Sequence, residues 1–209
     1  MTGPTFPSDY DYRTYNERLE KLIAFRQVSL ERDLERLHAW LNAEHVLPYW
    51  QLNDPLPTFR AELVEKIEDE HLAPYIGYLD HVPMSYWECY WAADDVIADY
   101  CETNAADQGI HLLIGPAEYL GRGYAEPLVR AVTEMQFCHP ETDRILTEPD
   151  VRNETVIHVF EKCGFEPLRE IELPEKDALL MACERAQFQQ HGSSGNETRV
   201  SADTGEDGQ

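Results

Sequence analysis

Two closely spaced glycines separate an apolar run from a helical pattern. Gly121 and Gly123 follow the run 109–114 and precede a helix expected over about 125–137. Glycine there permits positive φ values and lets a ligand approach the backbone closely. The first amides of the helix would face one concavity that suits an anion such as a pyrophosphate, with Arg122 adding charge. These amides belong to Gly121, Arg122, Gly123, Tyr124 and Ala125.

The same glycines have a plainer explanation, because many strand-to-helix turns use glycine only to turn. Two familiar phosphate loops are excluded. The sequence contains no GxxxxGK[ST], and GRGYAE lacks the third glycine of a dinucleotide-binding fingerprint. An anion site of another kind and a simple turn are the alternatives.

Two ionisable side chains stand at the ends of predicted strands. His111 opens the apolar run, and Asp150 follows a strand expected over 144–148. Both would flank the cleft beside the glycines, where a carboxylate assisted by a histidine could accept a proton from an attacking nucleophile. His111 could instead be a hydrogen-bonded core residue, and Asp150 an N-cap or turn former. No Ser-His-Asp or Cys-His arrangement is evident, so we expect no covalent enzyme intermediate.

An aromatic strand supplies a further candidate surface. In YWECYW, residues 86–91, one face carries Tyr86, Glu88 and Tyr90 and the other carries two tryptophans and Cys89. We expect the tryptophan face to be core. The face with Glu88 between two tyrosines could line a pocket that recognises a cationic amine.

The remaining pattern predicts a mixed α/β domain with helices packed on a central sheet. Helices are expected from Ser29, as N-cap, to about His45, from about Thr58, and over 125–137 and 154–163, the last closed by Gly164. The expected strands are 22–25, a hairpin within 73–95 that turns near Asp80 and His81, and 109–114, 144–148, 168–173 and 178–183. We assign residues 1–20 to an extended arm, 21–186 to the domain and 187–209 to a disordered acidic tail.

Charge limits the partners that the chain can have. It carries 40 acidic and 17 basic residues, a formal net charge of -23, and only four of the basic residues are lysine. Such a field disfavours nucleic acids and anionic membranes. The composition favours adaptation to a salt-rich cytoplasm, where ions screen the repulsion, over an ordinary acidic protein.

The remaining composition predicts a cytoplasmic protein without a metal site. No apolar stretch approaches the roughly 20 residues of a membrane helix, and the N-terminus lacks the features of a signal peptide. The five cysteines form no CxxC pair, which predicts reduced thiols and neither disulfides nor zinc.

Two segments together resemble the GNAT acetyltransferases. Residues 120–125, LGRGYA, are similar to the acyl-coenzyme A loop [Q/R]-x-x-G-x-[G/A] of that family, with Leu120 departing from the first position. Residues 148–168 resemble the C-terminal half, in which D-x-x-N precedes a helix ending in (Y/F)-E-K-x-G-F. The resemblance implies a GNAT-like, mostly antiparallel mixed sheet flanked by helices. It also places Asn153 where the family's asparagine contacts the pantetheine arm.

HLLIGP at 111–116 and EPDVRN at 148–153, together with LHAWLN and YWECYW, resemble the siderophore-biosynthesis branch. That branch acylates lysine or hydroxylysine side chains. The resemblance implies that His111 touches the acceptor and that Asp150 is the general base. The backbone at 112–114, including Leu113 and Ile114, is a candidate for polarising the thioester carbonyl.

These features predict transfer from acetyl-CoA, or another acyl-CoA, to an N-hydroxylated amine such as N6-hydroxylysine or an N-hydroxydiamine. The product would be a siderophore hydroxamate, and siderophore synthetases would be pathway partners. An aminoglycoside-type or other small-amine N-acetyltransferase is the alternative enzyme. A non-catalytic acyl-CoA-binding module is an alternative of another class.

Overall fold

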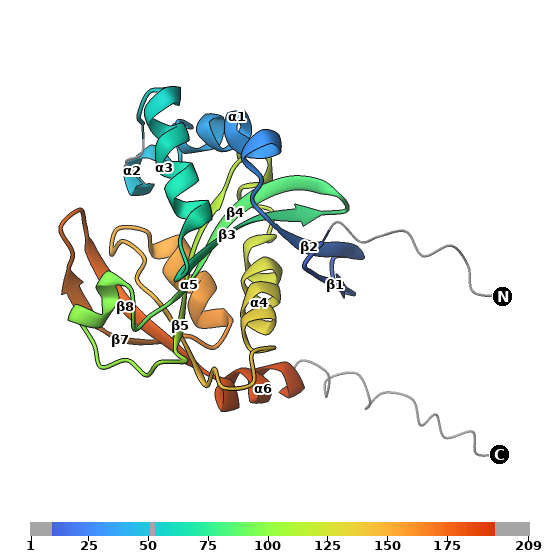
Figure 1. The fold of residues 1–209 in the computed structure, drawn as a ribbon. Helices are drawn as coiled ribbons and strands as arrows, with labels where there is room; N and C mark the ends of the chain where they lie inside the picture. Colours follow the sequence, from blue (N-terminus) through green and yellow to red (C-terminus); the bar gives the residue numbers. More distant parts are fainter. Residues whose placement is uncertain (1–9, 51–52, 195–209) are drawn as a thin grey trace, which may run out of the picture.

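One mixed sheet runs through the molecule, with helices on both faces (Figure 1). The computed structural model describes residues 10–50 and 53–194. Within them the strand order is β1-β2-β3-β4-β5-β6-β8-β7, and β5–β6 is the parallel pair in an otherwise antiparallel sheet. The strands are β1 Tyr12–Asn16, β2 Lys21–Gln27, β3 Leu72–Leu79, β4 Val82–Trp91, β5 Gln108–Ile114, β6 Arg144–Thr147, β7 Glu166–Glu172 and β8 Asp177–Glu184. The predicted mixed, mostly antiparallel sheet flanked by helices is confirmed.

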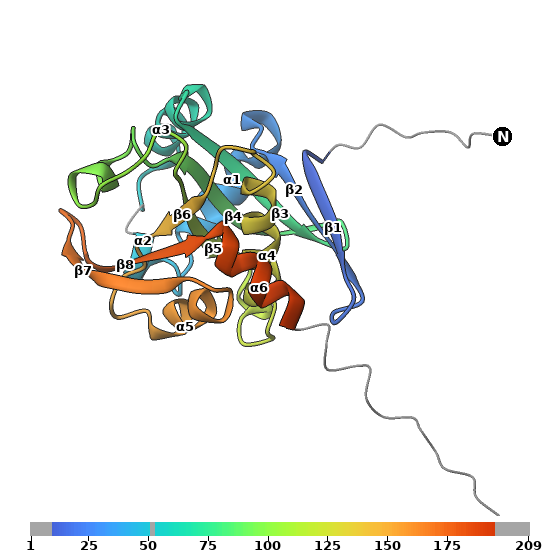
Figure 2. The same cartoon turned by 90° about the horizontal axis from the view of Figure 1, so that it is seen from below.

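The helices divide into two layers. They are α1 Leu30–Leu41, α2 Leu47–Trp50, α3 Leu56–Glu68, α4 Ala125–Gln136, α5 Glu154–Lys162 and α6 Arg185–Ser194, with short 3₁₀ turns η1 Val96–Asp99 and η2 Ala117–Tyr119. Figures 1 and 2 show α1 and α3 on one side of the sheet and α4 and α5 on the other. No described helix is long and apolar enough to cross a membrane.

Strand β4 sends alternate side chains into these two layers. Trp87 is fully buried against residues of α4 such as Leu128. Tyr86 packs on the other face with Leu37 of α1 and Leu63 of α3. The period-2 alternation of a strand produces this division, so the tryptophan face is core as predicted.

The parallel pair β5–β6 is short. The two strands pair only at Gln108 with Ile145 and at Gly109 with Leu146. Strand β5 continues to Ile114 while paired on its other side with β4. Strand β6 ends at Thr147. The last residues of β5 therefore have no strand on one side, and their backbone groups on that side are open to other partners.

The structure corrects the predicted edges of the domain. Residues 12–16, assigned to an arm, form β1 and pair with β2. The Tyr12 hydroxyl also donates to Glu134 of α4 at 2.8 Å. Residues 187–194, assigned to the tail, belong to α6, which Phe188 anchors against Phe137 with ring centroids 5.5 Å apart. Residues 1–9 and 195–209 lie outside the described part of the chain.

Helix α1 is shorter than predicted and is capped differently. It ends at Leu41, not near His45. Ser29 occupies the N-cap position without a side-chain cap, and its amide instead donates to Asp33 at 2.9 Å. Asp33 is fully buried and also accepts from Arg26 at 2.9 Å, so one carboxylate joins α1 to β2.

Gly115 lets α1 pack against the end of β5. A Cβ atom at Gly115 would lie 2.1 Å from Cδ2 of the Trp40 ring, far inside van der Waals contact. Trp40 is buried at 9% exposure in the α1 and α3 layer. HLLIGP and LHAWLN are therefore physical neighbours, and Trp40 is a packing residue.

We expect Gly115→Ala to lower the free energy of unfolding by about 1–3 kcal/mol, because the new methyl group overpacks the site. Urea denaturation measures the loss. In a Trp40→Leu background the penalty should shrink, since the two positions are coupled. A full penalty that persists in that background would show that the ring contact is not its cause.

Candidate active site

Two adjoining cavities open where β5 and β6 separate. The first, of about 660 Å³, lies between the end of β5 and the first turns of α4 and α5, and we call it the glycine-loop cleft. The second, of about 540 Å³, contains His111 and Asp150, and we call it the His111 pocket. The two share a wall formed by Tyr49, Trp50, Leu112, Asn153 and Val156.

The glycine-loop cleft fits a ligand that presses on the backbone. Gly121 and Gly123 have φ values of 67° and 76°, which side-chain-bearing residues rarely adopt. No heavy atom lies within 4 Å of a Cβ built at either glycine, so the space beside them is open. Tyr124 and Ala125 at the start of α4 also line the cleft. The start of α4 can therefore receive a pyrophosphate through its free amides.

The structure assigns the cleft's positive charge differently from the sequence. The Arg122 side chain is exposed and does not line the cleft. Lys162 at the end of α5 lines it instead. Arg122 was predicted from its place between the two glycines, but a position in a loop does not fix the direction of a side chain.

Helix α5 begins in the wall between the cavities. Asn153 is its N-cap, and its side chain accepts from the amide of Val156 at 3.3 Å. The N-cap role suits the short polar side chain of asparagine. Asn153 therefore lines both cavities while it also fixes the start of the helix.

The open edge of β5 presents alternate backbone groups. The carbonyl of Leu112 accepts from Trp50 Nε1 at 3.3 Å, and that of Ile114 is bonded to His45 Nε2 at 2.9 Å. Both carbonyls thus point away from β4. The amide and carbonyl of one strand residue point to the same side, so the amides of Leu112 and Ile114 face the cavities and that of Leu113 faces β4.

His111 is held between two buried carboxylates. Its Nδ1 lies 3.1 Å from Glu88 Oε2, and its Nε2 makes a short contact with Glu148 Oε1. Glu88 is the direct cross-strand partner of His111 in β4. Glu148 lies three residues beyond Ile145, as His111 lies three beyond Gln108, so the parallel register of β5 and β6 brings them together.

Further groups complete this cluster. The hydroxyl of Tyr86 donates to Glu88 at 2.8 Å, and that of Tyr90 donates to Glu148 at 2.8 Å. Lys66 Nζ lies 2.6 Å from Glu88 Oε1, and Lys176 Nζ lies 3.7 Å from Glu148 Oε1. The residues of the cluster come from α3, β4 and β5, from the position after β6 and from the position before β8.

The cluster fixes the charge of His111. Burial lowers the pKa of His111, but the charges and hydrogen bonds of Glu148 and Glu88 outweigh it and raise the pKa to about 10. Burial raises the pKa of each glutamate, yet His111 together with Lys66 or Lys176 brings both to about 2. At neutral pH the histidine is an imidazolium between two carboxylates, so it cannot accept a proton.

Asp150 lines the His111 pocket but is tied to a neighbour. Its Oδ1 accepts from the amide of Arg152 at 2.8 Å, and its Oδ2 lies 2.5 Å from Arg152 Nη2. The hydrogen bonds from the Arg152 side chain are the main cause that lowers the pKa of Asp150. Asp150 is therefore a carboxylate of low basicity that also forms the turn before α5.

Tyr90 has a different place from the one predicted. It was expected to line an acceptor pocket with Glu88, but its ring is 2% exposed and does not line the His111 pocket. Its hydroxyl holds Glu148, so it acts on the pocket through that carboxylate. Gly109 makes this possible, because a Cβ there would lie 2.1 Å from the Tyr90 ring.

Several residues that line the His111 pocket could not be identified from the sequence motifs. They are Tyr49, Trp50, Lys66, Asp95, Glu148, Glu175 and Lys176. Glu148 could have been found from the register of β5 and β6, once those strands were paired. The lysines carried no motif, and only their rarity in the chain sets them apart.

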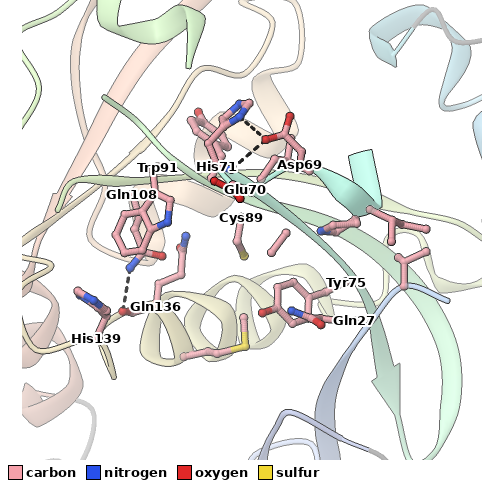
Figure 3. Close-up of a pocket in the computed structure, with 17 residues that line it drawn as sticks. Gln27, Asp69, Glu70, His71, Tyr75, Cys89, Trp91, Gln108, Gln136 and His139 are labelled. Carbon is pink, nitrogen blue, oxygen red and sulfur yellow. Dashed lines mark hydrogen bonds and ion pairs between the residues drawn. The ribbon is translucent and has the colours of Figure 1, made fainter. Parts of the chain in front are cut away.

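A third cavity, of about 400 Å³, lies on the α4 face of the sheet. Figure 3 shows Cys89 between a group with Asp69 and His71 and a group with Gln136 and His139. Cys89 follows Glu88 in β4, so this cavity lies on the opposite side of the strand from the His111 pocket. Among the described residues no group of three or more His, Cys, Asp or Glu could hold a metal ion.

Residues 29–173 match the family model described as an acetyltransferase (GNAT) domain. The chain belongs to the GNAT acetyltransferases. Acetyl-CoA or another acyl-CoA is therefore the co-substrate of this acyltransferase, and the open glycine loop fits it. The predicted family and fold are confirmed.

Two curated relatives are similar to the acetyltransferase over most of its length. One is the N(6)-hydroxylysine O-acetyltransferase of Escherichia coli, 30% identical over 186 residues. That match covers 88% of this chain but only 59% of the relative. The other is the N-hydroxyputrescine acetyltransferase of Acinetobacter baumannii, 30% identical, with 88% of this chain and 86% of the relative covered.

Solved structures agree on the fold. A crystal structure of an uncharacterized protein from Bacillus halodurans has a TM-score of 0.85 and 45% identity, and covers 88% of this chain and 94% of that one. The aminoglycoside acetyltransferase AAC(6')-Ib in complex with coenzyme A has a TM-score of 0.74 and 30% identity. That match covers 80% of this chain and 98% of that one.

We expect the His111 imidazole of the folded protein to show no titration between about pH 6 and 8.5 in NMR spectra. In the protein unfolded by urea, the same imidazole should titrate with a pKa of about 6.5. The stability that His111 contributes is complete below pH 6.5 and is lost as the pH rises toward 10. The contribution of Glu88 and Glu148 is complete above pH 4.5 and is lost as the pH falls toward 2.

Glu148→Gln removes one of the two charges and should bring the titration of His111 down toward the neutral range. The isosteric amide keeps the packing around the ring. A wild-type His111 that titrates near pH 6.5 in the folded protein would contradict the permanent imidazolium.

Proposed function

We propose that the enzyme transfers the acetyl group of acetyl-CoA to the nitrogen of an N-hydroxylated side-chain or terminal amine. The product is a hydroxamate of the kind found in siderophores. The observation that carries the proposal is the junction of the two cavities, where the open edge of β5 and Asn153 form the wall between the glycine-loop cleft and the His111 pocket. The two relatives, an N(6)-hydroxylysine O-acetyltransferase and an N-hydroxyputrescine acetyltransferase, support this acceptor class.

The residues in the shared wall suit attack on a thioester. The amides of Leu112 and Ile114 donate to the carbonyl oxygen as it becomes negative. The hydroxylamine nitrogen, which is largely neutral near neutral pH, forms a bond to the carbonyl carbon of the thioester. The carbon–sulfur bond then breaks, and coenzyme A leaves as a thiolate that takes up a proton.

Asp150 accepts the proton that the nitrogen loses. Its low basicity is sufficient, because the nitrogen of the tetrahedral adduct is far more acidic than that of the free hydroxylamine. His111 is already protonated, so it contributes to the reaction as a positioning cation. Its ring holds Glu88 and Glu148 in the wall of the pocket, and its positive charge offsets the repulsion between the two carboxylates.

The enzyme so described would work in the cytoplasm and supply siderophore synthetases in iron acquisition. Its charge of -23 with four lysines supports adaptation to high salt. The alternative acceptor is an aminoglycoside, which the similarity to AAC(6')-Ib favours. A non-catalytic acyl-CoA-binding module is a further alternative, and coenzyme binding without turnover would favour it.

An acceptor panel tests the proposal. Release of coenzyme A thiol is followed in high salt with N6-hydroxylysine, N-hydroxycadaverine, lysine and kanamycin as acceptors. Turnover with a hydroxylamine above that with lysine or kanamycin is the expected result. Preference for kanamycin would replace the proposal with the aminoglycoside alternative.

We expect Asp150→Asn to lower kcat by about 10²-fold or more, because the amide cannot accept the proton that the attacking nitrogen loses. The amide keeps the acceptor for the Arg152 backbone, and an unchanged melting temperature controls for folding. In Arg152→Gln the pKa of Asp150 should rise, so the acid limb of the pH–rate profile should move to higher pH. If Asp150→Asn keeps its rate within about threefold of wild type, Asp150 is a turn former only.

A further inference from the structure

Lysines are concentrated at the cavities of this chain. The sequence contains only four, Lys21, Lys66, Lys162 and Lys176, among 40 acidic residues. Lys66 and Lys176 line the His111 pocket, and Lys162 lines the glycine-loop cleft. The residues that line the cavity of Figure 3 include none of the four. Two of the four lysines therefore line the His111 pocket, which the proposed function assigns to the acceptor.

Lys66 and Lys176 have N–H donors that no hydrogen bond to a described residue uses. An ammonium group carries three N–H donors. Within the described residues, Lys66 Nζ donates one hydrogen bond, to Glu88 at 2.6 Å. Lys176 Nζ lies 3.7 Å from Glu148, too far for a hydrogen bond. Their side chains are 34% and 16% exposed, so both ammonium groups are accessible from the pocket yet partly shielded from water.

The pocket presents both signs of charge. Glu88 and Glu148 are buried carboxylates, at 3% and 5% exposure, and Lys66, Lys176 and the His111 imidazolium lie against them. Asp95, the N-cap of the η1 turn, also lines the pocket and interacts electrostatically with His111. Free ammonium donors beside carboxylates complement a zwitterion, which carries both charges, better than a polycation.

We propose that the acceptor is an α-amino acid with a distal N-hydroxylated amine, whose carboxylate binds Lys66 and Lys176 and whose α-ammonium faces Asp95. This inference rests on the proposed function and narrows its acceptor class. A carboxylate between two ammonium groups forms charge-assisted hydrogen bonds with the N–H donors that Glu88 and Glu148 leave free. A diamine or an aminoglycoside has no anionic group to accept from these donors.

The test compares N6-hydroxylysine with N-hydroxycadaverine, which is the same molecule without the carboxylate. With saturating acetyl-CoA at one fixed salt concentration, wild-type kcat/KM should favour N6-hydroxylysine by about tenfold or more. Lys66→Met and Lys176→Met should narrow that preference, chiefly through a higher KM for the amino acid. Lys21→Met is the matched control, because Lys21 pairs with Asp80 and lines neither cavity, and it should keep the wild-type preference.

Equal turnover of the two hydroxylamines, or a preference for N-hydroxycadaverine, would overturn this inference and leave the proposed function standing. If neither hydroxylamine reacts, lysine and cadaverine provide the same comparison without the hydroxyl group. A preference for lysine over cadaverine would then support the zwitterion site while refuting a hydroxylated acceptor. Turnover confined to polyamines or aminoglycosides would refute both.

Discussion

The separation of β5 from β6 after two residue pairs is the constraint on which the whole site depends. Had the parallel pairing continued, the amides and carbonyls of β5 would be satisfied by β6 and no cleft could form between the strands. Because it stops, the carbonyls of Leu112 and Ile114 are capped by side chains from the α1–α2 region, and their amides face the cavities. The same separation leaves room for the starts of α4 and α5, whose N-termini frame the glycine-loop cleft.

The electrostatics of the His111 pocket follow from the same registers. Antiparallel pairing with β4 places Glu88 on one side of His111, and the extended parallel register places Glu148 on the other. Two buried carboxylates without an intervening cation would be costly, and one of them would take up a proton. The imidazolium avoids that outcome, so it is a fixed structural charge. The proposed mechanism therefore assigns the proton transfer to Asp150, which belongs to a different segment.

Much of the fold could be predicted from local sequence patterns. The hairpin turn at Asp80 and His81 is confirmed, with φ values of 48° and 68°. Helix α5 ends as predicted, with Gly164 at a φ of 94° after its C-terminus. The glycines of the family motif line the cleft and Asn153 caps α5, because short motifs record local backbone geometry. Their part in coenzyme binding stays a prediction.

What the sequence did not reveal depends on contacts between distant segments. Strand β1 has only five residues, lies at the edge of the sheet and is half-exposed, so its apolar signal is weak. Glu148 reads as an ordinary strand-end residue until the register with β5 is known. Lys66 and Lys176 come from different layers of the fold, and nothing near them in the chain marks them as neighbours of one histidine.

The most direct measurement of the central claim is the identity of the bond that the enzyme makes. The enzyme is incubated with acetyl-CoA and N6-hydroxylysine in high salt, and the product is examined by mass spectrometry and by its complex with ferric iron. Acylation of nitrogen gives a hydroxamate, which gains one acetyl group and forms a coloured ferric chelate, and the account predicts this product. A product that carries the acetyl group but forms no ferric chelate, or no product while an aminoglycoside is acetylated, would contradict it.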